Sequence, residues 1–431
     1  MAFKKKNELF QWAKDLFPIH RSLTGNGNRK TLLYIKKKIN NLKIIEVPSG
    51  KKVYDWKIPD EWNVTNAYIK NNKGEKILDI KDNNLHIVSY SKPIKKKVNL
   101  KELKKHLYTI KKLPDAIPYV TSYYKKKWGF CIKYNNYKKL KSGIYKVYID
   151  SKFNKNGFLT YGEYYFPGKS KKEILFSTNI CHPSMANNEL SGIIVAMAIS
   201  KFLKKLKRNY SYRILFIPET IGAINFIHDN YSNLKKNLKA GFVLACLGDN
   251  GKFSYVPSPK GDTLADKIYL TVLKKYFKNF KKYNWLNRGS DERQFCSPLI
   301  DLPVVCISKS KFAGYKEYHT SLDNLNFISK EGLEESFSMI KRCITSIENK
   351  KFYKTKIPCE AFLTKYNLID TTNFFYKNNS KKKNNHIISD IISFCNGKND
   401  ISDISEECKI PEETVKKNID ILLKKKIIVQ H

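Results

Sequence analysis

The chain has 431 residues, and its 81 Lys and Arg residues against 39 Asp and Glu residues give a formal net charge of +42. A hydrophobic share of 42% with 13% aromatic residues is enough for a packed core, which excludes a wholly disordered chain. At roughly 100–200 residues per domain, the length predicts two to four domains. No stretch approaches ~18 consecutive apolar residues, so the sequence predicts no membrane span. The first residues are basic and amphipathic without an apolar signal core, and we expect a cytoplasmic protein.

The positive charge favours a nucleic-acid partner at first sight, because basic surfaces attract phosphates. However, only seven of the basic residues are Arg, the residue preferred for bidentate contacts to phosphate and guanine. The Lys residues are spread along the whole chain, so we expect most of the charge to be solvated surface. The nine cysteines include no CxxC pair, which indicates buried free thiols rather than a cysteine-based zinc site.

The first half of the chain predicts two kinds of structure. Apolar residues at helical spacing predict helices over 1–45, as the N-terminal part of a larger domain. Short strand-like runs separated by Asn, Gly, Lys and Pro clusters then predict an inserted β-rich domain over 46–115.

Residues 116–355 alternate between apolar strand candidates and amphipathic helices. The predicted strands are 173–180, 213–219, 242–249 and 302–308, and the predicted helices are 191–206, 263–277 and 329–347. This alternation predicts an α/β domain with a mostly parallel sheet and helices on both faces.

The last part, 356–431, predicts three short helices and a terminal strand, which resemble a winged helix-turn-helix. Its third helix carries Lys416 and Lys417, with three more lysines at 424–426. One interpretation is contact with DNA through that helix. The other, favoured by the absence of Arg from this part, is a small packing or protein-contact domain.

Ligand-type residues stand where the predicted strands end. His182 follows the strand at 173–180, Glu219 ends the strand at 213–219, and Asp249 ends the next. Because the carboxyl ends of parallel strands meet at one edge, these residues predict a metal site there. Each also has a structural alternative: a loop hydrogen bond for His182, a helix cap for Glu219, and a turn for Asp249.

Four motifs carry a family resemblance: RSLTG at 21–25, CHPS at 181–184, SDERQF at 290–295 and YHTS at 318–321. They resemble aminopeptidase-like bacterial proteins of the zinc-dependent exopeptidase superfamily. That narrower group has an inserted β-rich domain and a C-terminal winged helix, and it is often associated with surface-polysaccharide synthesis. The resemblance covers about 150–350 and extends to the N-terminal helices.

The resemblance implies roles for individual residues. His182 and His319 fall on histidine ligands of the two-zinc pattern, and Glu219 falls on its general base. Four positions depart from that pattern: Asn188 replaces the bridging Asp, Thr220 the second Glu, Ala245 a strand-end Asp, and Ser184 an Asp beside the first His. We therefore expect a single Zn²⁺, held by His182, His319 and one of Glu189, Asp249 or Asn188. A helix cap is the alternative role for Asn188 and Glu189.

These features predict a zinc-dependent, aminopeptidase-like hydrolase of a peptide-like amide bond, with a small peptide-like or amino-acid-linked substrate. Glu219 would move the proton, while Arg21, Arg293 or Tyr318 would hold a substrate carboxylate or the oxyanion. Asp291 is a further catalytic candidate, and a surface ion pair with Arg293 is its alternative. The competing hypotheses are a catalytically eroded binding or regulatory protein and a DNA-binding regulator. The sequence also allows a homo-oligomer.

Overall fold

The computed structural model describes residues 8–277, 279–369 and 381–430. The chain forms two compact units that divide between Thr345 and Ser346, and each is described by itself. In the described ranges, no helix is long and apolar enough to cross a membrane.

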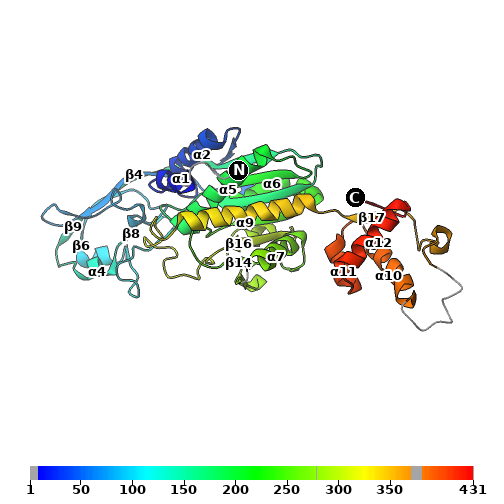
Figure 1. Ribbon diagram of the computed structural model, residues 1–431. Helices are drawn as coiled ribbons and strands as arrows, with labels where there is room; N and C mark the ends of the chain where they lie inside the picture. The colour runs from blue at the N-terminus through cyan, green and yellow to red at the C-terminus, as the bar shows by residue number, and fades with distance from the viewer. Residues whose placement is uncertain (1–7, 278, 370–380, 431) are drawn as a thin grey trace. The chain divides into compact units, whose positions relative to one another are not determined.

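A mixed sheet of eight strands forms the centre of the first unit (Figure 1). Its spatial order is β1 (Lys43–Pro48), β10 (Phe158–Phe166), β12 (Ser211–Ile217), β11 (Glu173–Asn179), β13 (Leu238–Leu244), β16 (Val304–Ser308), β14 (Ser254–Val256) and β15 (Lys281–Lys282). The four strands β12, β11, β13 and β16 are parallel, as predicted. Antiparallel pairing joins β1 and β10 at one edge and β14 near the other, which the sequence analysis did not foresee.

Both faces of the central strands are covered. Every residue of β11, β12 and β16 is buried, and side chains of a strand alternate between the two faces. The helices of this unit are α1 (Glu8–Leu16), α2 (Asn26–Ile39), α5 (Ser191–Lys205), α6 (Ile221–Asn237), α7 (Leu264–Tyr276), α8 (Glu292–Phe295) and α9 (Lys330–Asn349). Helix α5 packs on β11 and β13, and α2 packs on β10 and α5. The predicted α/β fold is therefore confirmed.

A β-rich segment is inserted between β1 and β10. Its four-stranded antiparallel sheet has the order β5 (Lys76–Asp79), β4 (Glu61–Lys70), β9 (Ile144–Asn154) and β6 (Ile94–Asn99). The smaller elements are β2 (Lys52–Val53), β3 (Trp56–Lys57), α3 (Leu100–Lys104), β7 (Leu107–Tyr108), β8 (Phe130–Cys131) and α4 (Tyr134–Lys138). Strand β9 lies beyond residue 115, so the inserted sheet reaches further along the chain than the predicted 46–115. The local sequence of β9 does not show that its partners, β4 and β6, lie many residues earlier in the chain.

The second unit has its own apolar core, which includes Ile391, Val415 and Leu422. It consists of β17 (Tyr353–Thr355), a 3₁₀ turn (Leu363–Tyr366), α10 (Lys381–Phe394), α11 (Ile401–Cys408), α12 (Glu412–Lys424) and β18 (Ile428–Gln430). Strands β17 and β18 pair antiparallel. Three helices and a two-stranded sheet are compatible with a winged helix, which stays a prediction.

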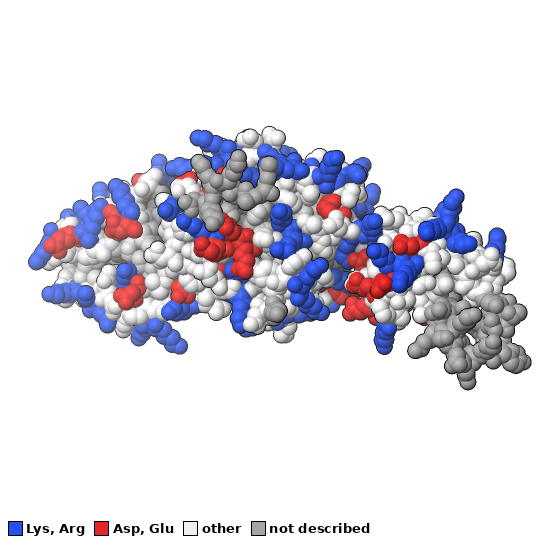
Figure 2. Space-filling view, in the orientation of Figure 1, with Lys and Arg blue, Asp and Glu red and all other residues white. Residues whose placement is uncertain are grey.

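Figure 2 shows Lys and Arg side chains distributed over the visible face, with acidic and uncharged residues among them. This distribution agrees with the interpretation of the charge as mostly solvated surface.

Candidate active site

His182 lies in the loop that follows β11, where the chain leaves the carboxyl edge of the sheet. Its ring is buried, and its Nδ1 atom lies 2.7 Å from Oε2 of Glu189. Burial lowers the pKa of His182, but Cys181 and the hydrogen-bonded Glu189 raise it by more, so that it lies above its ordinary value. The Glu189 contact orients the ring so that Nε2 is the nitrogen available to a ligand.

Glu189 belongs to a π-helical turn, Ala186–Leu190, that leads into α5. Its Oε2 atom also accepts hydrogen bonds from the backbone N–H groups of Cys181 at 2.7 Å and of His182 at 2.5 Å. Its Oε1 atom accepts one from Nε of Arg21 at 3.0 Å. Burial raises the pKa of Glu189, yet His182 and Arg21 lower it below its ordinary value, so the carboxylate stays ionised.

Arg21 is fully buried, which removes it from the groups that could bind a substrate. Besides Glu189, its guanidinium donates to the carbonyl oxygens of His182 at 3.1 Å and Leu16 at 2.8 Å. The sequence predicts that Arg21 holds a carboxylate of the substrate. In the structure, Arg21 binds the carboxylate of Glu189 instead.

Two other predicted residues lie beside the His182 ring. Oε2 of Glu219 lies 3.8 Å from His182 Nε2, which is longer than a hydrogen bond. The rings of His182 and His319 have their centroids 5.3 Å apart. Nε2 of His319 is buried without a hydrogen-bond partner among the described residues, and burial together with His182 lowers the pKa of His319 to about 3. His319 is therefore a neutral imidazole at neutral pH.

Tyr119, which the sequence analysis missed, packs against both histidines. The centroid of its ring lies 5.1 Å from the His182 ring and 5.1 Å from the His319 ring. Its hydroxyl group lies 3.1 Å from that of Tyr123. Burial raises the pKa of Tyr119 well above its ordinary value, so the hydroxyl stays protonated. Tyr119 stands in the run AIPYVTSYY, which matches no metal-ligand or catalytic motif, and no sequence signal could have singled it out.

Asp291 and Arg293 both contact Thr220, the residue that follows Glu219. Oδ1 of Asp291 accepts a hydrogen bond of 2.7 Å from the Thr220 backbone N–H, and Nη2 of Arg293 donates one of 2.8 Å to Thr220 Oγ1. Asp291 is fully buried, which excludes the alternative of a surface ion pair. Burial and the charge of Glu219 raise the pKa of Asp291 well above its ordinary value.

Tyr318 is stacked on His319 with ring centroids 3.9 Å apart, and burial and Glu219 raise its pKa. Residues from three of the four motifs, CHPS, SDERQF and YHTS, thus lie near Glu219. The backbone is left-handed at both His319, with φ 55°, and Thr220, with φ 64°. Such conformations are costly for residues with a side chain and often occur at functional sites.

Asp249 and Asn188 have contacts of a structural kind. Oδ1 of Asp249 accepts hydrogen bonds from Gly251 N–H and Ser310 Oγ, and Oδ2 accepts one from the side-chain amide of Asn187 at 2.8 Å. Asp249 therefore closes the turn that was its structural alternative. The backbone N–H of Asn188 donates to Asp323, and its side-chain amide lies 3.9 Å from Met185 Sδ.

The residue types around Glu219 fit a zinc ion, because zinc prefers imidazoles and carboxylates. The His182 and His319 rings have centroids 5.3 Å apart, and Nε2 of His319 is buried without a hydrogen-bond partner in the part of the chain that the structure describes. Cys181, His182 and Glu189 also converge on one another. However, two ligands of one tetrahedral zinc lie about 3.3 Å apart, and the 2.7 Å between His182 Nδ1 and Glu189 is a hydrogen-bond distance. Burial raises the pKa of the Cys181 thiol to about 11, so it stays neutral.

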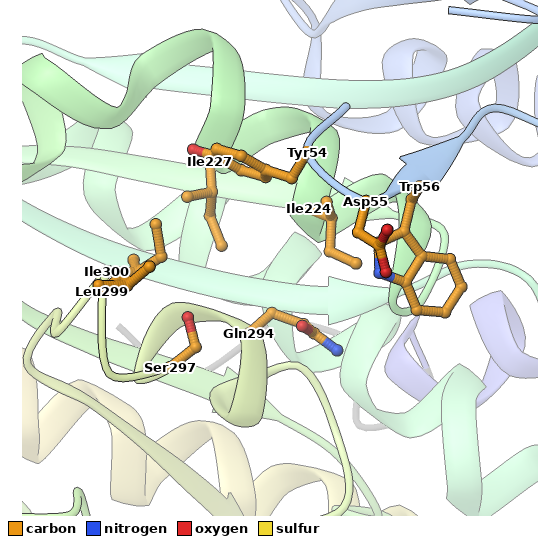
Figure 3. A pocket seen from close by; sticks show the side chains of 9 residues that line it. All are labelled: Tyr54, Asp55, Trp56, Ile224, Ile227, Gln294, Ser297, Leu299 and Ile300. Atoms are coloured by element: carbon orange, nitrogen blue, oxygen red, sulfur yellow. The ribbon is translucent and has the colours of Figure 1, made fainter. Parts of the chain in front are cut away.

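A cavity of about 260 Å³ lies between the β2–β3 hairpin and α6 (Figure 3). Its lining is mostly apolar and consists of Tyr54, Asp55, Trp56, Ile224, Ile227, Gln294, Ser297, Leu299 and Ile300. None of the predicted catalytic residues lines it. Two of its walls are helices that begin beside the site, α6 directly after Thr220 and α8 directly after Asp291.

A family described as "Domain of unknown function (DUF4910)" matches residues 10–350 of the chain. The chain belongs to the DUF4910 family. A relative from Clostridium acetobutylicum, named "Putative polysaccharide biosynthesis protein with aminopeptidase-like domain", is 47% identical over 359 residues. These residues are 83% of the DUF4910 chain described here and 82% of the relative.

Solved structures resemble this DUF4910 chain over most of its length. The crystal structure of a "putative peptidase" from Clostridium acetobutylicum has a TM-score of 0.82 and 41% identity, and it covers 99% of this chain and 96% of its own. BSAP, a zinc aminopeptidase from Bacillus subtilis, has a TM-score of 0.58 and 14% identity, over 80% of this chain and 95% of its own. The latter likeness shows the fold alone. The DUF4910 chain therefore has an aminopeptidase-like domain.

Proposed function

We propose that the protein is a zinc-dependent aminopeptidase-like hydrolase of a peptide-like amide bond, with Glu219 as its general base. One observation carries the proposal: the Glu219 carboxylate lies 3.8 Å from His182 Nε2, and the His319 ring lies beside the His182 ring, with centroids 5.3 Å apart. A carboxylate base beside two imidazole rings supplies the parts that metal-assisted hydrolysis needs. The aminopeptidase-like fold supports the same reaction class.

His182 and His319 would hold the ion, and Glu189 would act through His182. When bound, zinc lowers the pKa of a water molecule and polarises the scissile carbonyl group. Glu219 would accept a proton from the attacking water and deliver it to the nitrogen of the leaving amine, so its carboxylate would be regenerated at the end of the reaction. Its carboxylate is partly exposed, which leaves it accessible to substrate.

Asp291 and Arg293 assist through their contacts with Thr220, the residue after Glu219. Burial and the charge of Glu219 raise the pKa of Asp291 well above its ordinary value, which favours the protonated form of Asp291 beside the base. Arg293 donates a hydrogen bond to the Thr220 hydroxyl group at the site. Its side chain is exposed, so it can also bind a carboxylate of the substrate. Tyr318 keeps its proton and donates a hydrogen bond to the developing oxyanion.

The substrate class follows from these groups and from the relative. An amide with a negatively charged group nearby matches Arg293 and the positive charge of the chain. The name of the Clostridium acetobutylicum relative suggests that this amide belongs to an amino-acid-linked intermediate of polysaccharide synthesis.

Metal content and turnover test the proposal together. Protein purified without chelator should carry about one zinc per chain and hydrolyse members of a panel of aminoacyl p-nitroanilides and aminoacyl amino sugars. Glu219→Gln should keep the metal and lose about 10²–10⁴-fold in kcat. A wild-type protein that neither contains nor binds zinc or manganese and turns over no member would overturn the proposal. Unchanged turnover in Glu219→Gln would remove Glu219 as the base.

A second candidate is a catalytically eroded protein that binds an amino-acid-like ligand. It is favoured by Thr220, which stands where the two-zinc pattern has a metal-binding Glu and which is held by Asp291 and Arg293. This candidate predicts ligand binding without zinc. Isothermal titration of the same panel into the metal-free protein distinguishes it from the hydrolase, whose affinity for substrate amides would fall on chelation.

A further inference from the structure

We propose that Glu189 and Arg21 form a positioning pair that fixes the His182 ring as its Nδ1–H tautomer and presents Nε2 to the metal. The inference rests on the proposed zinc site, and it assigns a role to two residues that the sequence analysis placed among metal ligands and substrate-binding groups. Neither residue touches the reacting atoms in this role.

The Glu189 carboxylate lies against the Nδ1 edge of the His182 ring. Its Oε2 atom lies 2.7 Å from His182 Nδ1 and accepts the backbone N–H groups of Cys181 and His182 as well. Three donors around one oxygen leave it no place for a metal ion, and they fix the carboxylate against the ring edge. A carboxylate only accepts hydrogen bonds, so the proton of the neutral ring must be on Nδ1. Histidine ligands of zinc commonly have such a carboxylate on their other nitrogen.

The residue that supplies such a carboxylate in the two-zinc pattern is absent from this chain. The two-zinc pattern has an Asp two residues after the first histidine, and this chain has Ser184 there. Ser184 has a left-handed backbone, and its hydroxyl donates to the Phe17 carbonyl at 3.0 Å and accepts from the Asn84 amide at 2.7 Å. It is thus occupied with other partners. Glu189 reaches the same imidazole from the turn before α5.

Arg21 is buried together with Glu189. A buried carboxylate is costly unless a partner of opposite charge and hydrogen bonds stabilise it. Arg21 supplies that charge at 3.0 Å, and the side chains of both partners are fully buried. Its planar fork also donates to the carbonyl groups of His182 and Leu16, so one side chain links α1, the histidine loop and Glu189. A lysine, with a single charged nitrogen, cannot make these three contacts in the same directions.

The experiment measures the tautomer and the zinc affinity separately. In metal-free wild-type protein labelled with ¹⁵N-histidine, measured at a pH high enough for the His182 ring to be neutral, this ring should show the Nδ1–H pattern, identified by its loss in His182→Gln. In Glu189→Gln this pattern should be lost or exchange-broadened. Zinc affinity, measured by competition with a chelating dye, should fall about 10–100-fold in Glu189→Gln, with a smaller decrease in Arg21→Lys.

The matched control is Glu173→Gln. Glu173 is another buried carboxylate paired with an arginine, Arg213, and it lies at the opposite end of the same strand β11. This variant should leave the His182 tautomer and the zinc affinity unchanged. A merely structural role for Glu189 predicts that both variants behave alike.

The possible results of these measurements test the positioning pair and the proposed function separately. A wild-type His182 ring with its proton on Nε2 would overturn the inference, even if Glu189→Gln does not fold. A folded Glu189→Gln with wild-type tautomer and zinc affinity would overturn it too. Should that variant fail to fold, Glu189→Asp keeps the charge but shortens the reach, and unchanged zinc affinity there would count against the pair. If the wild-type protein binds no zinc, the proposed function fails, while the tautomer measurement still decides the role of Glu189.

Discussion

The backbone N–H of Tyr119 donates a hydrogen bond of 2.8 Å to the carbonyl oxygen of His319. The neighbouring residues Pro118 and Thr320 form an antiparallel bridge, so the two segments are joined over more than one residue. Tyr119 lies between β7 and β8 of the inserted segment, whereas His319 belongs to the aminopeptidase-like domain. The inserted segment therefore builds one wall of the candidate site and fixes the loop that carries a predicted zinc ligand.

Tyr119→Ala should weaken zinc binding and lower the free energy of unfolding by about 3 kcal/mol, because it removes a ring that packs on both histidines. Tyr119→Phe keeps the ring and the backbone hydrogen bond and should retain most of the zinc affinity. Chelator competition and urea unfolding measure the two effects. Equal zinc affinity in Tyr119→Ala and wild type would show that the ring does not support the histidines.

His182→Ala and His319→Ala should each abolish the binding of the same zinc ion. Their ring centroids are 5.3 Å apart, which suits two ligands of one ion. Elemental analysis of dialysed protein should find less than about 0.1 zinc per chain in either variant, against about one in wild type. His86→Ala, in the inserted segment, is the control, since its Nδ1 contacts the Cys131 carbonyl. Half of the metal retained in each variant would indicate two separate ions instead.

His20 should make the protein less stable in acid. Burial, together with the charge of Arg21, lowers the pKa of His20 to about 4, against about 6.5 in an unfolded chain. The unfolded state therefore binds a proton at a higher pH than the folded state does. The stability from the neutral ring is complete above pH ~6.5 and is lost as the pH falls toward 4.

The comparison for His20 is with His20→Gln, which cannot titrate. Between pH 7 and pH 4.5 the free energy of unfolding of wild type should fall by on the order of 2 kcal/mol more than that of the variant. Urea unfolding at both pH values provides the measurement. Parallel pH profiles for the two proteins would mean that His20 titrates normally in the folded state.

Gly192→Ala should destabilise the first unit by about 1–3 kcal/mol. A Cβ atom at Gly192 would lie 2.6 Å from the Leu244 carbonyl oxygen and would also clash with the Thr178 hydroxyl. Both are in the strands on which the start of α5 packs, so α5 would have to move away from the sheet. Thermal unfolding measures the loss, and an unchanged melting temperature would show that α5 tolerates such a shift.

The sequence predicted the centre of the fold well because the signal there is local. Apolar runs such as 173–180 and 242–249 form buried parallel strands, and the carboxyl ends of parallel strands must meet at one edge. His182 and Glu219 therefore came together as expected. Asp249 did not join them, because its Oδ1 accepts from Gly251 in the turn after the strand and its Oδ2 accepts from the side chain of Asn187.

Other parts of the site could not be predicted because they depend on long-range packing. The role of Glu189 depends on Arg21, which lies 168 positions earlier in the chain, and that of Tyr119 depends on the path of the inserted segment. The direction of the strands at the sheet edges could not be predicted either. A short edge strand has the same composition whether its neighbour runs parallel or antiparallel to it.

The pairing of β1 with β10 has a consequence for how the chain folds. Pro48 pairs with Phe158, and the backbone N–H of Ser49 donates to the Gly157 carbonyl at 2.9 Å, so the inserted segment leaves and re-enters the sheet at one point. The edge of the sheet can form only after a loop of more than a hundred residues, 49–157, has been closed. If the inserted segment folds first, its two ends are already adjacent when the sheet edge forms. The entropy cost of closing the loop is then offset by contacts within the inserted segment. The connectivity of the chain then sets the order of folding: the inserted segment folds first, and the β1–β10 edge of the sheet forms afterwards.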